Sequence, residues 1–172
     1  MQELKIEYLH DFIRNNVFWK NITTIKSKDM FSEKEWNKIF PDLSSFKEIE
    51  DFLSKGYGQC MIANTLTGES FAFVFLYCED DSGKKISFHG GGWRKNNSMQ
   101  HYFAAVALIE ELFASGYKVR TSCLLNNDVA FRFLHSLGFI KYRSTEYYHY
   151  MWLPYKRFIN TPIYKRVQNN NE

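Results

Sequence analysis

Residues 86–139 constrain the fold of this chain more than any other stretch of its sequence. A strand pattern at 86–89 runs into three consecutive glycines at 90–92, and a polar loop then opens a long helical pattern. A second apolar run at 117–125 and a short helical pattern ending at Gly138 follow. This order of elements brings the free N–H groups of a helix N-terminus beside the edge of a sheet, where an anionic ligand can bind.

Composition and charge exclude several classes of protein. A chain of 172 residues, 45% of them hydrophobic and 18% aromatic, has the size and apolar content of one folded domain, which we place over residues 1–172. Its 22 basic and 19 acidic residues are too balanced to predict nucleic-acid binding. No apolar run reaches the roughly 20 residues that span a bilayer, and no secretory signal pattern is present. We therefore expect a cytoplasmic protein that binds neither membranes nor nucleic acids.

The three cysteines are far apart in the sequence. Cys60, Cys78 and Cys123 each lie in an apolar run, and their spacing fits no metal site. An odd number of widely spaced cysteines favours buried free thiols in a reducing compartment.

The first 90 residues alternate between helical and strand patterns. Leu4, Tyr8, Phe12 and Ile13 predict a short amphipathic helix that ends near residues 15–16. A capping-box sequence that begins at Ser32 predicts a second helix, which Pro41 ends. The other expected elements are a strand at 17–25, a helix from 44 or 45 to 56, a hairpin of strands at 57–66 and 70–78, a turn at 80–83, and a strand at 85–89.

The glycines at 90–92 require a physical reason, because three glycines together cost conformational entropy and pack nothing. A β-bulge that splays the strand from its neighbour is one reason, close approach of a ligand is another, and a plain glycine turn is a third. The cationic residues Arg94 and Lys95 follow, just before a helix that Asn97 or Ser98 can cap. This loop can hold a phosphate, or it can be an ordinary helix start with surface charges.

The helices of this stretch have clear apolar stripes. The longer helix ends at Gly116, and the shorter one is capped by Asn127 or Asp128 and stops at Gly138. Two strands are expected at 142–144 and 147–153, and a basic aromatic tail from about residue 155 is expected to be solvated and frayed at its end. The stripes are Ala105, Leu108, Ile109, Leu112 and Phe113 in the longer helix, and Ala130, Phe133, Leu134 and Leu137 in the shorter one.

A motif at the end of this stretch resembles that of a known family. Asn127, Ala130, Leu137, Gly138 and Phe139 have the spacing of the N-x-x-A-x-x-x-Y-x-x-L-G-F signature of the GNAT acetyltransferase superfamily. The order of the expected elements is also similar to that family over most of the chain. The resemblance implies an α/β acyl-CoA N-acyltransferase fold, in which helices flank a mixed, mostly antiparallel sheet.

The resemblance also implies an acetyl-CoA site between the glycine-ended strand and the strand at 117–125. In the family, the pyrophosphate rests on an R/Q-x-x-G-x-G/A loop, and this chain has Asn and Met where those glycines are expected. A shift of one residue puts Lys95, Ser98 and Gln100 in those roles instead. The residues that the resemblance assigns to acetyl-CoA are Gly91, Gly92, Trp93, Arg94, Lys95, Asn96, Asn97, Ser98, Met99 and Asn127.

The resemblance leaves the catalytic groups to be found. Many family members use the tyrosine of the signature as a general acid, but this chain has Leu134 there. His135 is adjacent, but one residue turns it roughly 100° around the helix. His89, at the strand end beside the glycines, is the candidate general base, or else a structural histidine. Further candidates are Tyr147, Tyr148, His149 and Tyr150 as acids or sheet residues, and Glu79, Asp80 and Asp81 as turn carboxylates that can attract a cationic amine.

Two functions remain open at this stage. The first is an N-acyltransferase that moves an acetyl group from acetyl-CoA to a primary amine of a small molecule or peptide by direct attack in a ternary complex. The second is an inactive GNAT-fold binding or interaction module, motivated by the missing loop glycines and the missing tyrosine. A homodimer is left open in either case.

Overall fold

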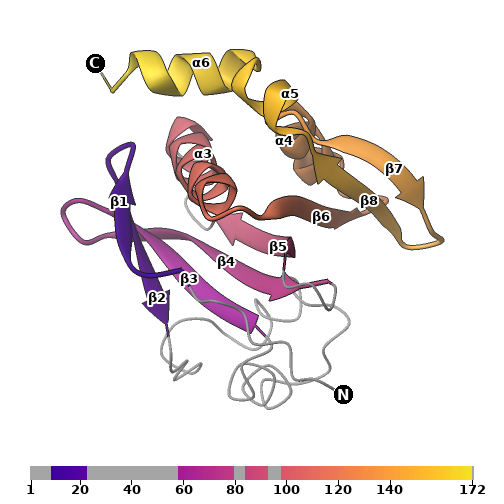
Figure 1. Ribbon diagram of the computed structural model, residues 1–172, viewed down its shortest axis with the longest axis horizontal. Coiled ribbons are helices and arrows are strands. Elements are labelled where there is room, and N and C mark those ends of the chain that lie inside the picture. The colour runs from indigo at the N-terminus through magenta and orange to yellow at the C-terminus, as the bar shows by residue number, and fades with distance from the viewer. Residues whose placement is uncertain (1–8, 23–57, 80–83, 93–97, 172) are drawn as a thin grey trace.

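The computed structural model describes residues 9–22, 58–79, 84–92 and 98–171. Within these residues, eight strands form one sheet in the order β1-β2-β3-β4-β5-β6-β8-β7 (Figure 1). All neighbouring strands are antiparallel except β5 and β6, so the sheet is mixed and mostly antiparallel, as expected. The elements are β1 (Phe12–Arg14), β2 (Val17–Ile22), β3 (Gly58–Thr65), β4 (Ser70–Cys78), β5 (Lys85–Gly92), α3 (Ser98–Ala114), β6 (Lys118–Leu124), α4 (Asp128–Ser136), β7 (Ile140–Ser144), β8 (Tyr148–Leu153), α5 (Tyr155–Ile159) and α6 (Pro162–Asn169).

The chain near Phe12 is a strand, so the helix predicted over this region is wrong for its described part. β1 pairs with β2 around a two-residue turn at Asn15 and Asn16, whose φ angles are 54° and 59°. Consecutive left-handed residues make the tight turn that matches the twist of a hairpin, and asparagine tolerates this conformation better than most residues. Residues 1–8, the helices predicted between 32 and 56 and the turn predicted at 80–83 lie outside the described residues.

The described helices lie on one side of the sheet (Figure 1). The inward stripe of α3 packs on β2, β4 and β6, and its residues Ile109 and Leu112 are fully buried. The Trp19 indole N–H of β2 donates to the Ala104 carbonyl of α3 over 3.0 Å. This bond fixes α3 across the first half of the sheet.

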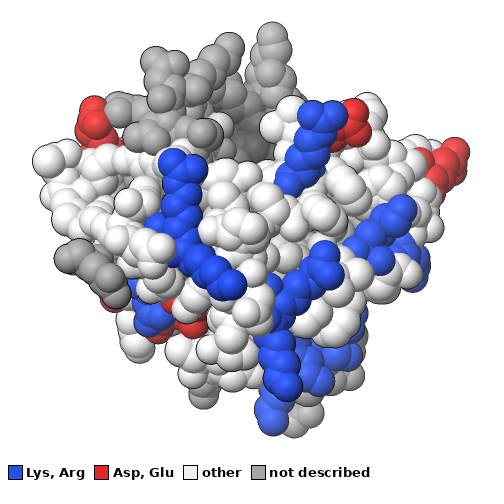
Figure 2. All heavy atoms as spheres, turned by 90° about the horizontal axis from the view of Figure 1, so that it is seen from above, with Lys and Arg blue, Asp and Glu red and all other residues white. Residues whose placement is uncertain are grey.

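The C-terminal segment is helical and packed, so the prediction of a solvated tail is wrong. Phe158 of α5 and Val167 of α6 are fully buried, and the Gln168 amide donates to Glu110 of α3 over 2.8 Å. The apolar residues of this segment recur at helical spacing and therefore face α3, while the basic residues stay outside. Figure 2, which views the molecule from the side of α5 and α6, shows Lys and Arg side chains spread over this face.

The cysteine residues of the chain are all free thiols. Cys60 and Cys123 are buried and Cys78 is half-buried. Within the described residues, no three His, Cys, Asp or Glu side chains come together as a metal site. None of the described helices is long and apolar enough to span a membrane.

Candidate functional site

Strands β5 and β6 pair over three residues and then separate. Lys85–Ser87 lie beside Lys118–Arg120 in parallel, but β5 continues to Gly92 and β6 to Leu124. At the point of separation, the Thr121 hydroxyl donates to the Phe88 carbonyl over 2.7 Å. A side chain thus replaces the next bond of the ladder, and the two strands diverge to leave an opening between them.

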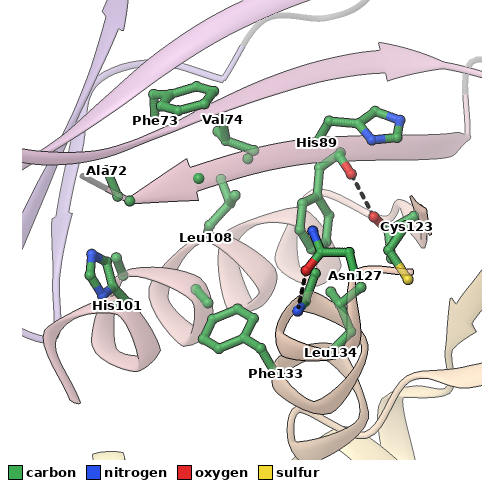
Figure 3. A pocket seen from close by; sticks show the side chains of 18 of the residues that line it. Ala72, Phe73, Val74, His89, His101, Leu108, Cys123, Asn127, Phe133 and Leu134 are labelled. Atoms are coloured by element: carbon green, nitrogen blue, oxygen red, sulfur yellow. Dashed lines mark hydrogen bonds between the residues drawn. The ribbon is translucent and has the colours of Figure 1, made fainter. Parts of the chain in front are cut away.

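A cavity of about 520 Å³ fills this opening (Figure 3). Its walls come from both splayed strands, from β4, and from the facing sides of α3 and α4. The small side chains of Ala104 and Ala105 of α3 leave space on one side of the cavity, and Phe133 and Leu134 of α4 make the other side apolar. Such a cavity suits a long, partly apolar ligand that lies between two strands.

The backbone of Gly90 and Gly92 faces this opening. The Lys84 and Phe88 carbonyls both point to β6, because they accept from the Lys118 amide and the Thr121 hydroxyl. The two backbone groups of a strand residue point to the same edge, and the edge alternates along the strand. The N–H and C=O groups of Gly90 and Gly92 therefore point to the side that β6 has left. They can hydrogen-bond a ligand as a neighbouring strand would.

The three glycines do not form the β-bulge that the sequence suggested. Pairing with β4 runs in register from His89 to Gly92 without a shift. The glycines are instead needed for close approach: a Cβ on Gly90 would lie 2.7 Å from the Phe73 carbonyl oxygen, and one on Gly92 would lie 2.1 Å from His101 Nε2. The strand separates because β6 diverges, and the absence of side chains lets its neighbours come close.

The residues of the family-like motif lie where α4 meets the cavity. The Asn127 side chain caps α4 by accepting from the Ala130 amide over 3.0 Å, and both residues line the cavity. Leu134 also lines it and is buried, whereas His135 is exposed on another side of α4. Of the two caps that the sequence left open, Asn127 and Asp128, the structure has Asn127, and the outward turn of His135 is confirmed.

The loop that the resemblance assigned to pyrophosphate is only partly described. Trp93, Arg94, Lys95, Asn96 and Asn97 lie outside the described residues. Ser98 and Met99 begin α3, whose first turn contains no acidic residue. The N-terminus of α3 can therefore face an anion without a competing carboxylate.

His89 lies on the other side of β5 from Leu108 and His101, yet it borders the same cavity (Figure 3). Its Nε2 is 3.1 Å from the Tyr77 hydroxyl, and the two rings stack with centroids 5.6 Å apart. Burial raises the pKa of the Tyr77 hydroxyl, and a hydrogen bond with Ser87 offsets part of this rise. Tyr77 therefore keeps its proton at neutral pH and holds the His89 ring.

Among the other predicted acids and carboxylates that the structure describes, Tyr148 alone borders the cavity. Glu79 is paired with Arg120 at 3.5 Å, and Asp80 and Asp81 lie outside the described residues. Tyr147 is 64% exposed, whereas Tyr148 borders the cavity. The remaining two are engaged elsewhere: His149 bonds Ser144 at 2.9 Å and packs on Phe131, and Tyr150 lies under the Arg143 guanidinium.

Sequence reasoning missed polar residues of the cavity, among them His101, Thr121 and Cys123. His101 stands four residues before Ala105 and so continues the inward stripe of α3 toward its start. Thr121 and Cys123 alternate with Val119 on a buried strand, which places all three on the side of the helices. Burial raises the pKa of the Cys123 thiol. Extending both periodic patterns by one step would have found these residues.

Comparison with solved structures identifies the fold. An uncharacterized protein from Bacillus halodurans superposes with a TM-score of 0.72 at 13% identity, over 91% of this chain and 92% of that chain. Spermidine N-acetyltransferase from Vibrio cholerae, in complex with CoA and spermine, gives 0.68 at 10% identity, over 86% and 100%. Campylobacter jejuni N-acetyltransferase PseH, in complex with acetyl coenzyme A, gives 0.59 at 14% identity, over 81% and 99%. The chain therefore has the GNAT acyl-CoA N-acyltransferase fold. No family model matches it, and no curated protein matches its sequence.

Proposed function

We propose that this chain is an N-acetyltransferase that takes an acetyl group from acetyl-CoA and gives it to a primary amine. The observation that carries this proposal is the opening between β5 and β6 beyond Ser87 and Arg120, which we call the fork. Here a cavity of about 520 Å³ meets the unpaired backbone edge of Gly90 and Gly92. The amides of a pantetheine arm can pair with that edge, which offers both donors and acceptors. Neighbours of the same fold that hold CoA or acetyl coenzyme A support the proposal.

The residues around the cavity fit such an acyl donor. Ala104 and Ala105 leave room for a chain to pass between α3 and the strands, and Phe133 offers it an apolar wall. The start of α3 presents the positive end of a helix dipole to a diphosphate, with no acidic residue in its first turn. Asn127 shapes the far wall by capping α4.

The reaction is a direct transfer in a ternary complex. The donor supplies an activated acetyl group, whose carbonyl carbon the neutral amine attacks; the C–N bond forms and the C–S bond to CoA breaks. Proximity of the two reactants in the fork provides much of the rate. His89 takes on its Nδ1 the proton that the amine nitrogen loses, while its Nε2–H donates to the Tyr77 hydroxyl oxygen at 3.1 Å. The departing thiolate takes its proton from a group other than Leu134, for which the Tyr148 hydroxyl at the cavity is the candidate.

The acceptor is proposed only as a primary amine of a small molecule or peptide. The Vibrio cholerae neighbour is a spermidine N-acetyltransferase, and another structure of this fold, FdhC, is a nucleotide-linked sugar GNAT. One fold therefore serves chemically different acceptors. A panel of amines should therefore include a polyamine, a nucleotide-linked amino sugar and a peptide.

The second candidate function is binding without transfer. Leu134 favours it, because an apolar side chain borders the cavity at the position where the family signature has a tyrosine. In that case the fork binds a ligand, or the fold binds a partner, and no acetyl group moves.

Calorimetry with acetyl-CoA and a free-thiol assay with the amine panel separate the two functions. The enzyme is expected to bind acetyl-CoA saturably and to release CoA thiol with at least one amine. His89→Gln should lower kcat about 100-fold, within the usual contribution of a general base, and leave the affinity for acetyl-CoA unchanged. His149→Gln, which changes a histidine bonded to Ser144, is the matched control. Binding without thiol release supports the second function, and no binding of any CoA thioester contradicts the first.

A further inference from the structure

One histidine of the cavity has a buried nitrogen without a partner. His101 Nε2 is inaccessible to solvent and makes no hydrogen bond within the described part of the chain. The ring lies in the first turn of α3, with its centroid 5.9 Å from that of Phe71 on the adjoining strand. A buried polar atom that pairs with nothing destabilises the protein, so its presence in a cavity wall calls for a ligand that pairs with it.

The main chain around His101 is built to admit the ring. A Cβ on Gly92 would lie 2.1 Å from Nε2, so glycine alone permits this approach. Gly92 is also the last residue of β5, and its backbone faces the opening left by β6. The unpartnered nitrogen therefore lies against the Cα of Gly92, the residue whose backbone groups also face the opening. Figure 3 shows His101 and Leu108 on α3, on the same side of β5.

We propose that the His101 ring turns from Gly92 toward the cavity when acyl-CoA binds, and that its Nε2 then donates a hydrogen bond to an oxygen of the ligand, an assignment that rests on the proposed function. CoA brings two kinds of acceptor oxygen near the start of α3, those of its diphosphate and those of its pantetheine amides. Imidazole donates from Nε2 both as the cation and as the neutral tautomer with its proton there. In this chain His101 thus supplies a donor at the end of a loop that has Asn and Met in place of the family glycines.

A purely structural role makes the opposite prediction for stability. If the ring only filled space against Phe71 and Gly92, a side chain of another shape, such as leucine, would pack less well and destabilise the protein. If instead Nε2 is a donor that waits for a ligand, an apolar replacement removes an unpaired buried group and stabilises the unliganded protein. Stability and ligand affinity should therefore change in opposite directions.

The experiment uses His101→Leu and His101→Gln in the full chain. His101→Leu is expected to weaken CoA binding about tenfold in calorimetry, the loss for one hydrogen bond to a charged group, and to raise the Tm of the unliganded protein by about 3 °C. His101→Gln, whose amide nitrogen can reach a similar position, should retain CoA affinity within about threefold. His135→Leu on the exposed side of α4 is the matched control and should change neither the affinity for CoA nor the Tm.

Two fragments identify the oxygen that is contacted. If the affinity for ADP falls tenfold in His101→Leu, the contact is to the diphosphate. If the affinity for pantetheine falls tenfold instead, the contact is to an amide. Unchanged CoA binding in His101→Leu overturns the assignment of His101 while the proposed function stands. No CoA binding by the wild-type chain at millimolar concentration overturns the proposed function and this inference with it.

Discussion

Gly90 is restricted to glycine by a single backbone atom. A Cβ there would lie 2.7 Å from the Phe73 carbonyl oxygen, which belongs to the sheet and cannot move alone. We expect Gly90→Ala to lower the free energy of unfolding by about 2 kcal/mol in urea titrations, the usual cost of overpacking. Gly91→Ala is the control, because its Cβ would meet only the Phe73 ring at 3.2 Å, and a ring can shift. Equal losses in both variants would contradict the argument.

Cys60 makes the stability of the protein sensitive to alkaline pH. Burial raises the pKa of its thiol from 9.0 to about 12, so the folded state keeps a proton that the unfolded state releases above pH 9. The stabilisation is complete below pH 9 and is lost as the pH rises toward 12. Between pH 9 and 10.5 the contribution of Cys60 should fall by about 2 kcal/mol.

Urea unfolding at both pH values measures this change. Cys60→Ala should show a smaller fall than wild type, by about that amount, because it has no thiol to ionise. Burial also raises the pKa of Tyr77, so part of the fall remains in the variant. An identical pH dependence in the two proteins would exclude Cys60 as its source.

Leu134 borders the cavity where the family signature has a tyrosine. If acetyl transfer is limited by protonation of the leaving thiolate, Leu134→Tyr should raise kcat about tenfold, a small part of what a positioned general acid supplies. The variant should also acquire a loss of activity at high pH, where tyrosine ionises near its usual pKa of about 10. Leu134→Phe provides the same bulk without the hydroxyl and is the control. A gain in both variants would mean that cavity shape, and not acid catalysis, was improved.

At the scale of elements, Thr121 sets where β5 and β6 part. Its hydroxyl donates to the Phe88 carbonyl over 2.7 Å at the first position without ladder pairing. Thr121→Val keeps the shape but leaves that buried carbonyl unpaired, so we expect a loss of about 2 kcal/mol in unfolding free energy. Because the fork also forms the cavity, the Kd for acetyl-CoA should rise several-fold in calorimetry. Thr67→Val, which removes a hydroxyl from the exposed turn before β4 and away from the cavity lining, is the control. An unaltered Kd in Thr121→Val would separate the fork from binding.

Elements with strong local signals could be predicted from the sequence. β4 has the predicted bounds 70–78, because the pattern is bounded by turn residues on both sides. The stop at Gly138 was also predictable, since its φ of 100° is one that glycine adopts readily. The predicted N-terminal helix is wrong in its described part, because Phe12 and Ile13 fit a helical stripe while the tight turn at 15–16 pairs them into a hairpin.

The site was predicted only where one segment determines it. Asn127 caps its own helix, so its position follows from the local sequence. His101 and Thr121 belong to the site because they contact Gly92 and Phe88. Each contact joins two different elements, so the pattern of one element does not predict it. The fork is likewise a relation between two strands, and no single pattern contains it. Sequence periodicity shows which side a residue faces but not what it meets there.

At the scale of the whole molecule, the C-terminal segment connects α3 with the first hairpin of the sheet. Val167 of α6 is fully buried, and Gln168 donates to Glu110 of α3 over 2.8 Å. Glu110 also lies 3.7 Å from Arg14 of the first hairpin, and the Asn171 amide donates to Asn15. The outer side of α3 therefore packs against α6 (Figure 1), while its inner side lines the cavity.

Removal of residues 162–172 should consequently affect both stability and binding. The buried side chain of Val167 and the half-buried Ile163 and Tyr164 lose their contacts, so we expect the free energy of unfolding to fall by about 4 kcal/mol in urea. The affinity for acetyl-CoA should fall with it, because α3 would keep only its contacts to the sheet. Removal of residues 170–172 alone is the control. It removes the exposed Asn170 and Asn171, with the exposed bond from Asn171 to Asn15, and should lower the free energy of unfolding by less than about 1 kcal/mol. If the longer truncation unfolds at the same urea concentration as the full chain, α6 contributes no net stability, and the hold on α3 must come from the sheet side alone.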